Sequence, residues 1–182
     1  MAKLRLFFAF DLDDEFKEKL YKYQKSLDTD TFRPLKKENL HITLAFLGDI
    51  EEERISALSD ILFYLDFPDK IILTAKKTIF FPSYKRPSAV AIEVGNPDKN
   101  IYIMEKALRK ELAIDGFIVD GRKYRPHITV AYIRRGTAVS SDMKIPDFSH
   151  SGRFSPVSVS LISSQLAKGG SIFTTLCSRK FN

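Results

Sequence analysis

One short sequence occurs twice in this chain, and it restricts the folds that the chain can adopt. Residues 41–46 read HITLAF and residues 127–132 read HITVAY, so both copies follow the pattern His-Ile-Thr-aliphatic-Ala-aromatic. The copies begin 86 residues apart in a chain of 182, and they contain two of its three histidines. Self-similarity on this scale indicates a repeated structural unit. We therefore predict a pseudo-symmetric molecule of two lobes, with one copy in each.

The alternation of polar and apolar residues predicts that each copy is a strand with one functional face. Side chains at positions i and i+2 of a strand point to the same side. His41 with Thr43, and His127 with Thr129, should therefore line a cleft between the lobes. We expect Ala45 and Ala131 to lie beside them on this face. The intervening side chains should face the core: Ile42, Leu44, Phe46, Ile128, Val130 and Tyr132.

The rest of the chain predicts strands mixed with amphipathic helices. Helices should begin near Asp13 and Glu51, where acidic residues suit a helix N-terminus, and a third should cover 97–112. Further strands are expected at 4–10, 40–47, 71–81, 88–94, 128–133, 157–162 and 172–176, with an irregular loop at 136–155. Several strands adjoin without a crossover helix, which favours an α+β fold of mainly antiparallel sheets with helices on their outer faces. We expect residues 1–182 to form one two-lobed domain.

The charge of the chain points to an acidic partner. The net charge is +6 and the isoelectric point is about 9.3, which favours nucleic acid or a phosphorylated small molecule. Between residues 121 and 141 there are five Lys and Arg residues and no acid before Asp142. The side of the molecule that carries the second copy of the repeat should therefore be the positive side.

The cellular setting is predicted from cysteine use and from the apolar runs. Cys177 is the single cysteine and cannot form an internal disulfide, which suits the cytoplasm. The apolar run at 6–10 is too short for a signal peptide, and no run approaches the ~18 residues of a membrane span. We therefore expect a cytoplasmic protein without a membrane segment.

Paired histidines and threonines suit chemistry at phosphorus. Opening a cyclic phosphodiester requires a proton to be removed on one side of the phosphorus and supplied on the other. Histidine, with a pKa of ~6.5, can perform either task near neutral pH, and threonine hydroxyls can donate to the non-bridging oxygens. Arg125, two residues before His127, is placed to pair with the phosphate. No metal-ligand spacing of His or Cys occurs, so we expect neither a metal nor a cofactor.

These motifs resemble those of the two-histidine (2H) phosphoesterase superfamily. The residues that carry the resemblance are RLFFAFD at 5–11, ENLHITLAFLG at 38–48, RPHITVA at 125–131, and the closing pattern of Leu161, Ser164, Leu166, Gly170, Phe173 and Leu176. Together they look like the bacterial and archaeal RNA 2′,3′-cyclic phosphodiesterases, also called 2′-5′ RNA ligases. Phe10 departs from this pattern, in which leucine is common at that place, and residues 136–155 match nothing in it.

The resemblance implies a reaction and a role for each residue. A terminal 2′,3′-cyclic phosphate would be hydrolysed to a 2′-phosphate, with His41 as proton donor and His127 as proton acceptor. Thr43, Thr129 and Arg125 would bind the phosphate. The substrates would be RNA ends or nucleoside 2′,3′-cyclic phosphates, handled by a monomer with no obligate protein partner. With an RNA 5′-hydroxyl in place of water, the reverse reaction would form a 2′-5′ linkage.

The surroundings of the two histidines suggest how their roles divide. Arg125 and its basic neighbours should lower the pKa of His127 and keep that ring neutral, whereas Glu38 could help to keep His41 protonated. Two other activities stay open at this point. The chain could cleave 2′-5′ oligonucleotides or a small cyclic nucleotide, or it could be a module that binds phosphorylated RNA ends without turnover. Retention of both histidines and both threonines favours catalysis, because binding alone does not require a matched acid and base.

Overall fold

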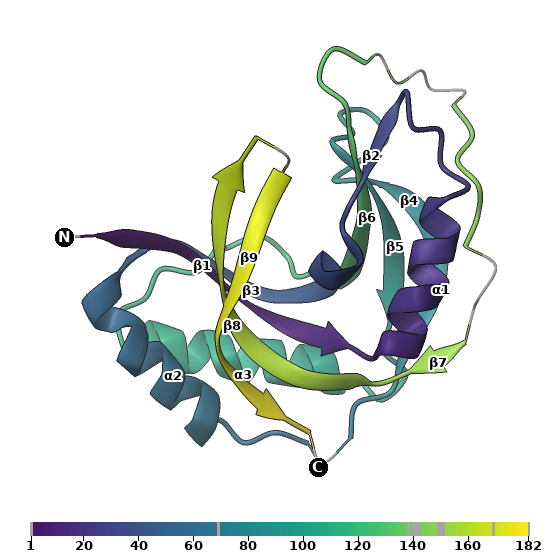
Figure 1. Ribbon diagram of the computed structural model, residues 1–182. Coiled ribbons are helices and arrows are strands. Elements are labelled where there is room, and N and C mark those ends of the chain that lie inside the picture. Colours follow the sequence, from purple (N-terminus) through teal and green to yellow (C-terminus); the bar gives the residue numbers. More distant parts are fainter. Residues whose placement is uncertain are drawn as a thin grey trace.

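The computed structural model describes residues 2–68, 70–137, 139, 143–148, 152–168 and 170–181. These residues form two antiparallel sheets and three α-helices, which confirms the predicted α+β class (Figure 1). The elements in chain order are β1 (Lys3–Leu12), α1 (Asp14–Gln24), β2 (Phe32–Pro34), the 3₁₀ turn η1 (Lys37–Asn39), β3 (His41–Glu51), the 3₁₀ turn η2 (Glu52–Arg54), α2 (Ile55–Tyr64), β4 (Leu73–Phe81), β5 (Ala89–Gly95), α3 (Asn100–Ile114), β6 (His127–Ile133), β7 (Arg153–Phe154), β8 (Pro156–Ala167) and β9 (Gly170–Lys180).

The two copies of the repeat lie in different sheets. The first sheet has the strand order β3-β1-β8-β9 and contains the first copy, in β3. The second sheet has the order β2-β6-β5-β4-β7 and contains the second copy, in β6. The sheets do not correspond to the two halves of the chain, because β1 pairs with both β3 and the C-terminal β8. The two sheets are therefore not the two halves of the sequence.

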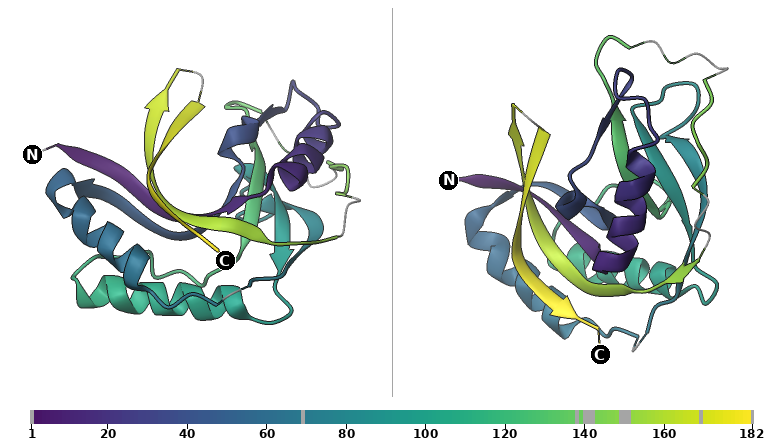
Figure 2. Two further views of the ribbon diagram at one scale, coloured as in Figure 1. Left: turned by 60° about the horizontal axis from the view of Figure 1, so that its bottom comes forward. Right: turned by 45° about the vertical axis from the view of Figure 1, so that its right-hand side comes forward.

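Helices α2 and α3 lie side by side against the first sheet, and α1 lies beside the second sheet (Figure 2). Helix α2 packs on β8 and β9, α3 packs on β3, and α1 lies against β6 of the second sheet. Helix α1 begins at its N-cap Asp13, whose carboxylate accepts a hydrogen bond from the Phe16 amide at 2.7 Å. At the other end of α1, the Gln24 side chain donates to the Val130 carbonyl at 2.6 Å and so ties the helix to the motif strand. One continuous hydrophobic cluster includes residues of both sheets.

A β-bulge occurs at the same place in both motif strands. Leu44 has no partner in the pairing of β1 with β3, and Val130 has no partner in the pairing of β5 with β6. A bulge inserts one unpaired residue, so every side chain beyond it moves to the opposite face. In both copies the side chains of positions one to four alternate as expected, and the alternation then reverses.

The bulges overturn part of the predicted facing. Ala45 and Ala131 are buried in the core, whereas Phe46 and Tyr132 are 36% and 37% exposed. The expectation that both aromatic residues face the core was wrong, because a strict period of two does not continue through a bulge. The two aromatic side chains lie on the open side of their sheets instead.

Most of the described residues in the expected irregular loop at 136–155 lie outside helices and strands, as predicted, with an exception near its end. Arg153 and Phe154 form the short strand β7, which pairs with β4 at the edge of the second sheet. The Phe148 ring is buried against Phe16 and Tyr23 of α1. The third histidine of the sequence, His150, lies outside the described residues. None of the described helices has the length and apolar character required to cross a membrane.

Candidate active site

His41 is the first residue of β3 and is held by its own chain. Its Nδ1 lies 2.7 Å from the Asn39 carbonyl oxygen, so Nδ1 carries a proton that it donates there. In the neutral ring Nε2 is then the acceptor, and the Thr43 hydroxyl, 3.1 Å away, donates to it. The rings of Phe7 and Phe173 pack against the imidazole with centroid distances of 5.0 and 5.4 Å. These contacts fix the tautomer and direct Nε2 towards the threonine.

His127 repeats this arrangement at the start of β6. Its Nδ1 lies 2.7 Å from the carbonyl oxygen of Arg125, which is again the residue two positions earlier in the chain. The imidazole stacks on the Phe81 ring, with centroids 3.9 Å apart and planes inclined by 19°. Both copies therefore hold a histidine by the same backbone contact and leave Nε2 as the atom that can exchange a proton.

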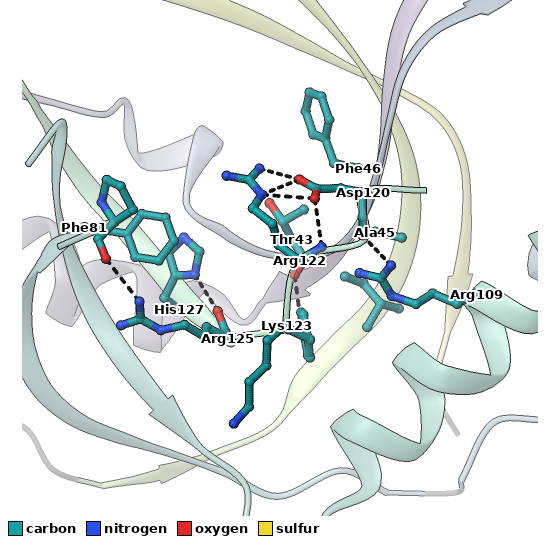
Figure 3. A pocket seen from close by; sticks show the side chains of 13 residues that line it. Thr43, Ala45, Phe46, Phe81, Arg109, Asp120, Arg122, Lys123, Arg125 and His127 are labelled. Atoms are coloured by element: carbon teal, nitrogen blue, oxygen red, sulfur yellow. Dashed lines mark hydrogen bonds and ion pairs between the residues drawn. The ribbon is translucent and has the colours of Figure 1, made fainter. Parts of the chain in front are cut away.

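Two adjoining cavities bring the four predicted side chains together. The smaller cavity, of about 340 Å³, is lined by His41, Thr43 and Thr129. The larger cavity, of about 450 Å³, is lined by Thr43 and His127, so Thr43 borders both (Figure 3). The charge of a protonated His127 would lower the pKa of His41. The residues that the repeat singled out lie around one site between the two sheets.

Arg125 also lines the larger cavity, although β6 does not extend back to it. The strand begins at His127, so Arg125 lies in the preceding loop with an exposed side chain. Its guanidinium donates to the Pro82 carbonyl at 3.1 Å and lies 5.4 Å from the Phe81 ring, on which His127 also stacks. A phosphate beside His127 would meet this guanidinium.

The basic segment before His127 is partly neutralised by acidic residues. The Arg122 Nε donates to both carboxylate oxygens of Asp120, at 2.7 and 3.0 Å. Arg109, which lines the same cavity, forms an ion pair with Glu105. Asp120 lies immediately before the stretch of residues 121–141 that contains no acid. The net positive charge of this side is therefore smaller than the sequence indicates.

Burial lowers the pKa of both histidines. The pKa of His41 falls to about 4, mainly through desolvation, and the positive charges of His127 and Lys17 add to the fall. The Asn39 carbonyl and the Asp11 carboxylate act in the opposite direction. Desolvation also lowers the pKa of His127, with a further contribution from the Arg125 guanidinium, as predicted. Both rings are therefore neutral at pH 7 in the ligand-free protein.

Asp11 is the acidic neighbour of His41, in place of the expected Glu38. In the pairing of β1 with β3, Asp11 lies directly opposite His41. Its carboxylate accepts hydrogen bonds from the hydroxyls of Ser158, at 2.5 Å, and Ser160. Asp11 precedes His41 by 30 residues, so only the strand register could have identified it as a neighbour.

Ten more residues line the smaller cavity and were not predicted as site residues, and two arginine–aromatic pairs are among them. The Arg5 guanidinium lies 5.0 Å from the centre of the Phe46 ring, and the Arg33 guanidinium lies 5.7 Å from that of Tyr132. No cluster of three or more His, Cys, Asp or Glu side chains that could hold a metal ion occurs among the residues that the structure describes.

Comparisons with known proteins identify relatives over most of the chain. The family model of LigT-like phosphoesterases matches residues 10–91. The RNA 2′,3′-cyclic phosphodiesterase of Archaeoglobus fulgidus is 30% identical, over 77% of this chain and 78% of its own length. That of Thermotoga maritima is also 30% identical, over 72% of this chain and 71% of its own length. That of Methanocaldococcus jannaschii is 27% identical, over 95% of this chain and 98% of its own length.

Solved structures show the same fold. The crystal structure of Escherichia coli LigT complexed with 3′-AMP superposes with a TM-score of 0.82 at 26% identity, covering 99% of each chain. TT0787 of Thermus thermophilus superposes with a TM-score of 0.85 at 21% identity, covering 98% of each chain.

Proposed function

This chain belongs to the LigT-like phosphoesterase family, and on that premise we propose that it hydrolyses the 2′,3′-cyclic phosphate at the end of an RNA strand to a 2′-phosphate. The observation that carries the proposal is the meeting of two His-x-Thr pairs, one from each sheet, around two adjoining cavities. The relatives named RNA 2′,3′-cyclic phosphodiesterase support the choice of substrate.

In the proposed reaction the two histidines act on opposite sides of the phosphorus. His127 Nε2 takes a proton from water as the water oxygen forms a bond to phosphorus. The bond from phosphorus to the 3′ oxygen breaks, and His41 Nε2 gives its proton to that oxygen. The product has a 2′-phosphate and a 3′-hydroxyl. His41 ends neutral and His127 ends protonated, so a proton must pass back through solvent before the next cycle.

The phosphate itself supplies the charge that this division of roles needs. An anion beside a histidine raises its pKa, so the substrate favours protonation of the otherwise neutral His41. Asp11 acts in the same direction from the neighbouring strand. On the other side, the positive charge of Arg125 opposes protonation of His127. Arg125 and the hydroxyls of Thr43 and Thr129 would bind the non-bridging oxygens and stabilise the charge that develops there.

The larger cavity favours a second activity of the same site. It adjoins His127, the proposed base, and with about 450 Å³ it has room for more than a water molecule. A 5′-hydroxyl of a second RNA strand could occupy the position of the attacking water. The site would then join the strands by a 2′-5′ linkage, in the reverse of cleavage.

We also propose that residues 1–182 work as one domain, in a cytoplasmic monomer that needs no obligate protein partner, metal or cofactor. One hydrophobic cluster connects both sheets, which supports a single domain. The lone half-buried Cys177 supports a reducing compartment.

The decisive experiment is incubation with nucleoside 2′,3′-cyclic monophosphates, with product identity determined by phosphorus NMR. We expect the nucleoside 2′-monophosphate, formed at a rate that a chelator does not change. Formation of the 3′-monophosphate would contradict the assignment of the leaving oxygen. Binding without turnover would favour the non-catalytic module, and loss of activity with chelator would contradict the two-histidine mechanism.

A further inference from the structure

Two arginine–aromatic pairs border the smaller cavity in related positions. Phe46 and Tyr132 are the sixth residues of the two copies of the repeat, and the matched bulges direct both towards the cavity. Each ring has a guanidinium near its face, Arg5 of β1 over Phe46 and Arg33 of β2 over Tyr132. We call these the two rim pairs. They lie in the cavity that also contains His41 and both threonines.

The charges of the rim pairs are not compensated within the described residues. Neither Arg5 nor Arg33 forms a hydrogen bond or an ion pair there, and both side chains are exposed. This contrasts with Arg109 and Arg122 at the larger cavity, which are paired with Glu105 and Asp120. Cation–π contact orients a guanidinium without using its N–H donors. The rim pairs therefore present two oriented, unoccupied sets of donors suited to an anion.

The two rim pairs come from opposite sheets and line the same cavity. Arg33 extends from the second sheet towards β9 of the first. If Gly170 of β9 carried a Cβ atom, that atom would lie 3.7 Å from Nη1 of Arg33. At about 340 Å³ the cavity is near the lower end of small-ligand pockets, so it suits one nucleotide and not several. If the cyclic phosphate lies at His41 and the threonines, the next phosphate of the strand reaches the rim.

We propose that the rim pairs bind the phosphodiester on the 5′ side of the terminal nucleotide, so that the enzyme prefers the end of an RNA strand to a free cyclic mononucleotide. Phe46 and Tyr132 are partly exposed, and their aromatic rings also suit contact with a base of the strand. This inference rests on the proposed function, because it assumes that the cyclic phosphate lies at the two histidines. It specifies the substrate class, and it predicts that the RNA on the 5′ side of the cyclic phosphate binds at the smaller cavity.

The test compares three substrates with progressively more of the RNA strand on the 5′ side. Adenosine 2′,3′-cyclic phosphate has no upstream phosphate, its 5′-phosphorylated form adds one anion, and the dinucleotide ApA with a 2′,3′-cyclic end adds a phosphodiester and a base. We expect kcat/KM to rise about ten-fold with the first added phosphate, mainly through a lower KM. KM should also rise more steeply with salt concentration for the substrates that carry the upstream phosphate, because salt screens the added contact.

Single substitutions at the rim then show which side chains cause this preference for phosphorylated substrates. Arg5→Gln and Arg33→Gln should each bring the ratio of kcat/KM between phosphorylated and unphosphorylated substrates towards one. Arg33→Lys, which keeps the charge, should retain part of the preference. Arg153→Gln is the matched control, because it removes the same charge from an exposed position on β7 that lines neither cavity, and it should leave the ratio unchanged.

Each result decides one of the two proposals. A wild-type ratio near one, or rim variants that lose activity equally on all substrates, would overturn the upstream-phosphate site while leaving the cyclic phosphodiesterase intact. A preference for the dinucleotide alone, lost in Phe46→Leu, would assign recognition to the base and overturn the phosphate contact. Absence of turnover on all three substrates would overturn the proposed function, and the inference with it.

Discussion

The two copies of the repeat share their internal geometry and differ in what surrounds them. Each holds a histidine by the carbonyl two residues earlier, and each has a bulge one residue after its threonine. The ring of His41 packs between two phenylalanines, with the Asp11 carboxylate near it. The ring of His127 stacks on Phe81 beside the Arg125 guanidinium. The difference teaches that the repeat positions two equivalent imidazoles, and that neighbouring strands and loops give them opposite electrostatic surroundings.

Removal of the imidazoles tests the proposed division of roles most directly. His41→Ala and His127→Ala should each lower kcat by about 10² to 10⁴, because each removes one partner of proton transfer. A substrate with a much better leaving group than a ribose hydroxyl depends less on the acid. It should therefore partly restore the activity of the His41→Ala variant and not that of the His127→Ala variant. Steady-state kinetics on both substrates measure this. Restoration of His127→Ala instead would reverse the two roles.

The charge beside His127 should matter more than an equal charge elsewhere. Arg125→Ala should lower kcat/KM on a cyclic mononucleotide by about 10- to 100-fold, through the loss of a charge-assisted contact with the phosphate. Arg153→Ala serves as the control on the far edge of the second sheet, and we expect little change. Similar rates in the two variants would place Arg125 outside the substrate contacts.

The two histidines should also differ in their effect on stability. Both have a pKa below that of an unfolded histidine, about 6.5, so well above that pH neither state binds a proton and the effect vanishes. As the pH falls towards 4, the unfolded state takes up the protons first and the folded state is destabilised. Relative to His41→Gln, the wild type should lose about 3 kcal/mol in the free energy of unfolding between pH 7 and pH 4.

Denaturant titrations between pH 4 and 7 would measure the effect, with His127→Gln as the comparison. A pH dependence identical in the wild type and His41→Gln would show that burial of this ring does not perturb its pKa.

The smallest expected effect concerns the acid beside His41. Asp11→Asn removes a negative charge that raises the pKa of His41, so the high-pH limb of kcat, which reports the enzyme–substrate complex, should move to lower pH. The shift should be less than about one unit, because the carboxylate is hydrogen-bonded to Ser158 and Ser160 and not to the imidazole. Glu38→Gln should leave the limb in place. The opposite outcome for the two variants would restore Glu38 as the acidic neighbour.

The sequence alone predicted those features of the candidate site that depend on neighbouring residues of one strand. His41 with Thr43, and His127 with Thr129, lie within unbroken strand segments, so a period of two assigns their faces correctly. The alternation fails after Leu44 and Val130, because a bulge depends on pairing with a neighbouring strand and leaves no signal in the motif itself. Phe46 and Tyr132 were therefore assigned to the wrong face.

Residues that join the site through pairing over long distances were not predictable in the same way. Arg33 reaches the cavity from β2, a strand of three residues that exists through its pairing with β6, about 100 residues later. Asp11 becomes the neighbour of His41 only through the register of β1 and β3. The layers of the fold were predictable from periodicity, whereas the order of strands within each sheet was not.

The pairing of β1 with β8 has a consequence for how the protein is made. β1 is an interior strand whose second partner, β8, begins at Pro156, so one edge of a strongly apolar segment lacks its partner until most of the chain has been synthesised. An unpaired apolar edge is a template for aggregation, and contacts between distant segments form slowly. A chain that ends before β8 would expose this edge permanently. Translation that stops early should therefore yield aggregated fragments and no half-active product, even though the first histidine motif is already complete.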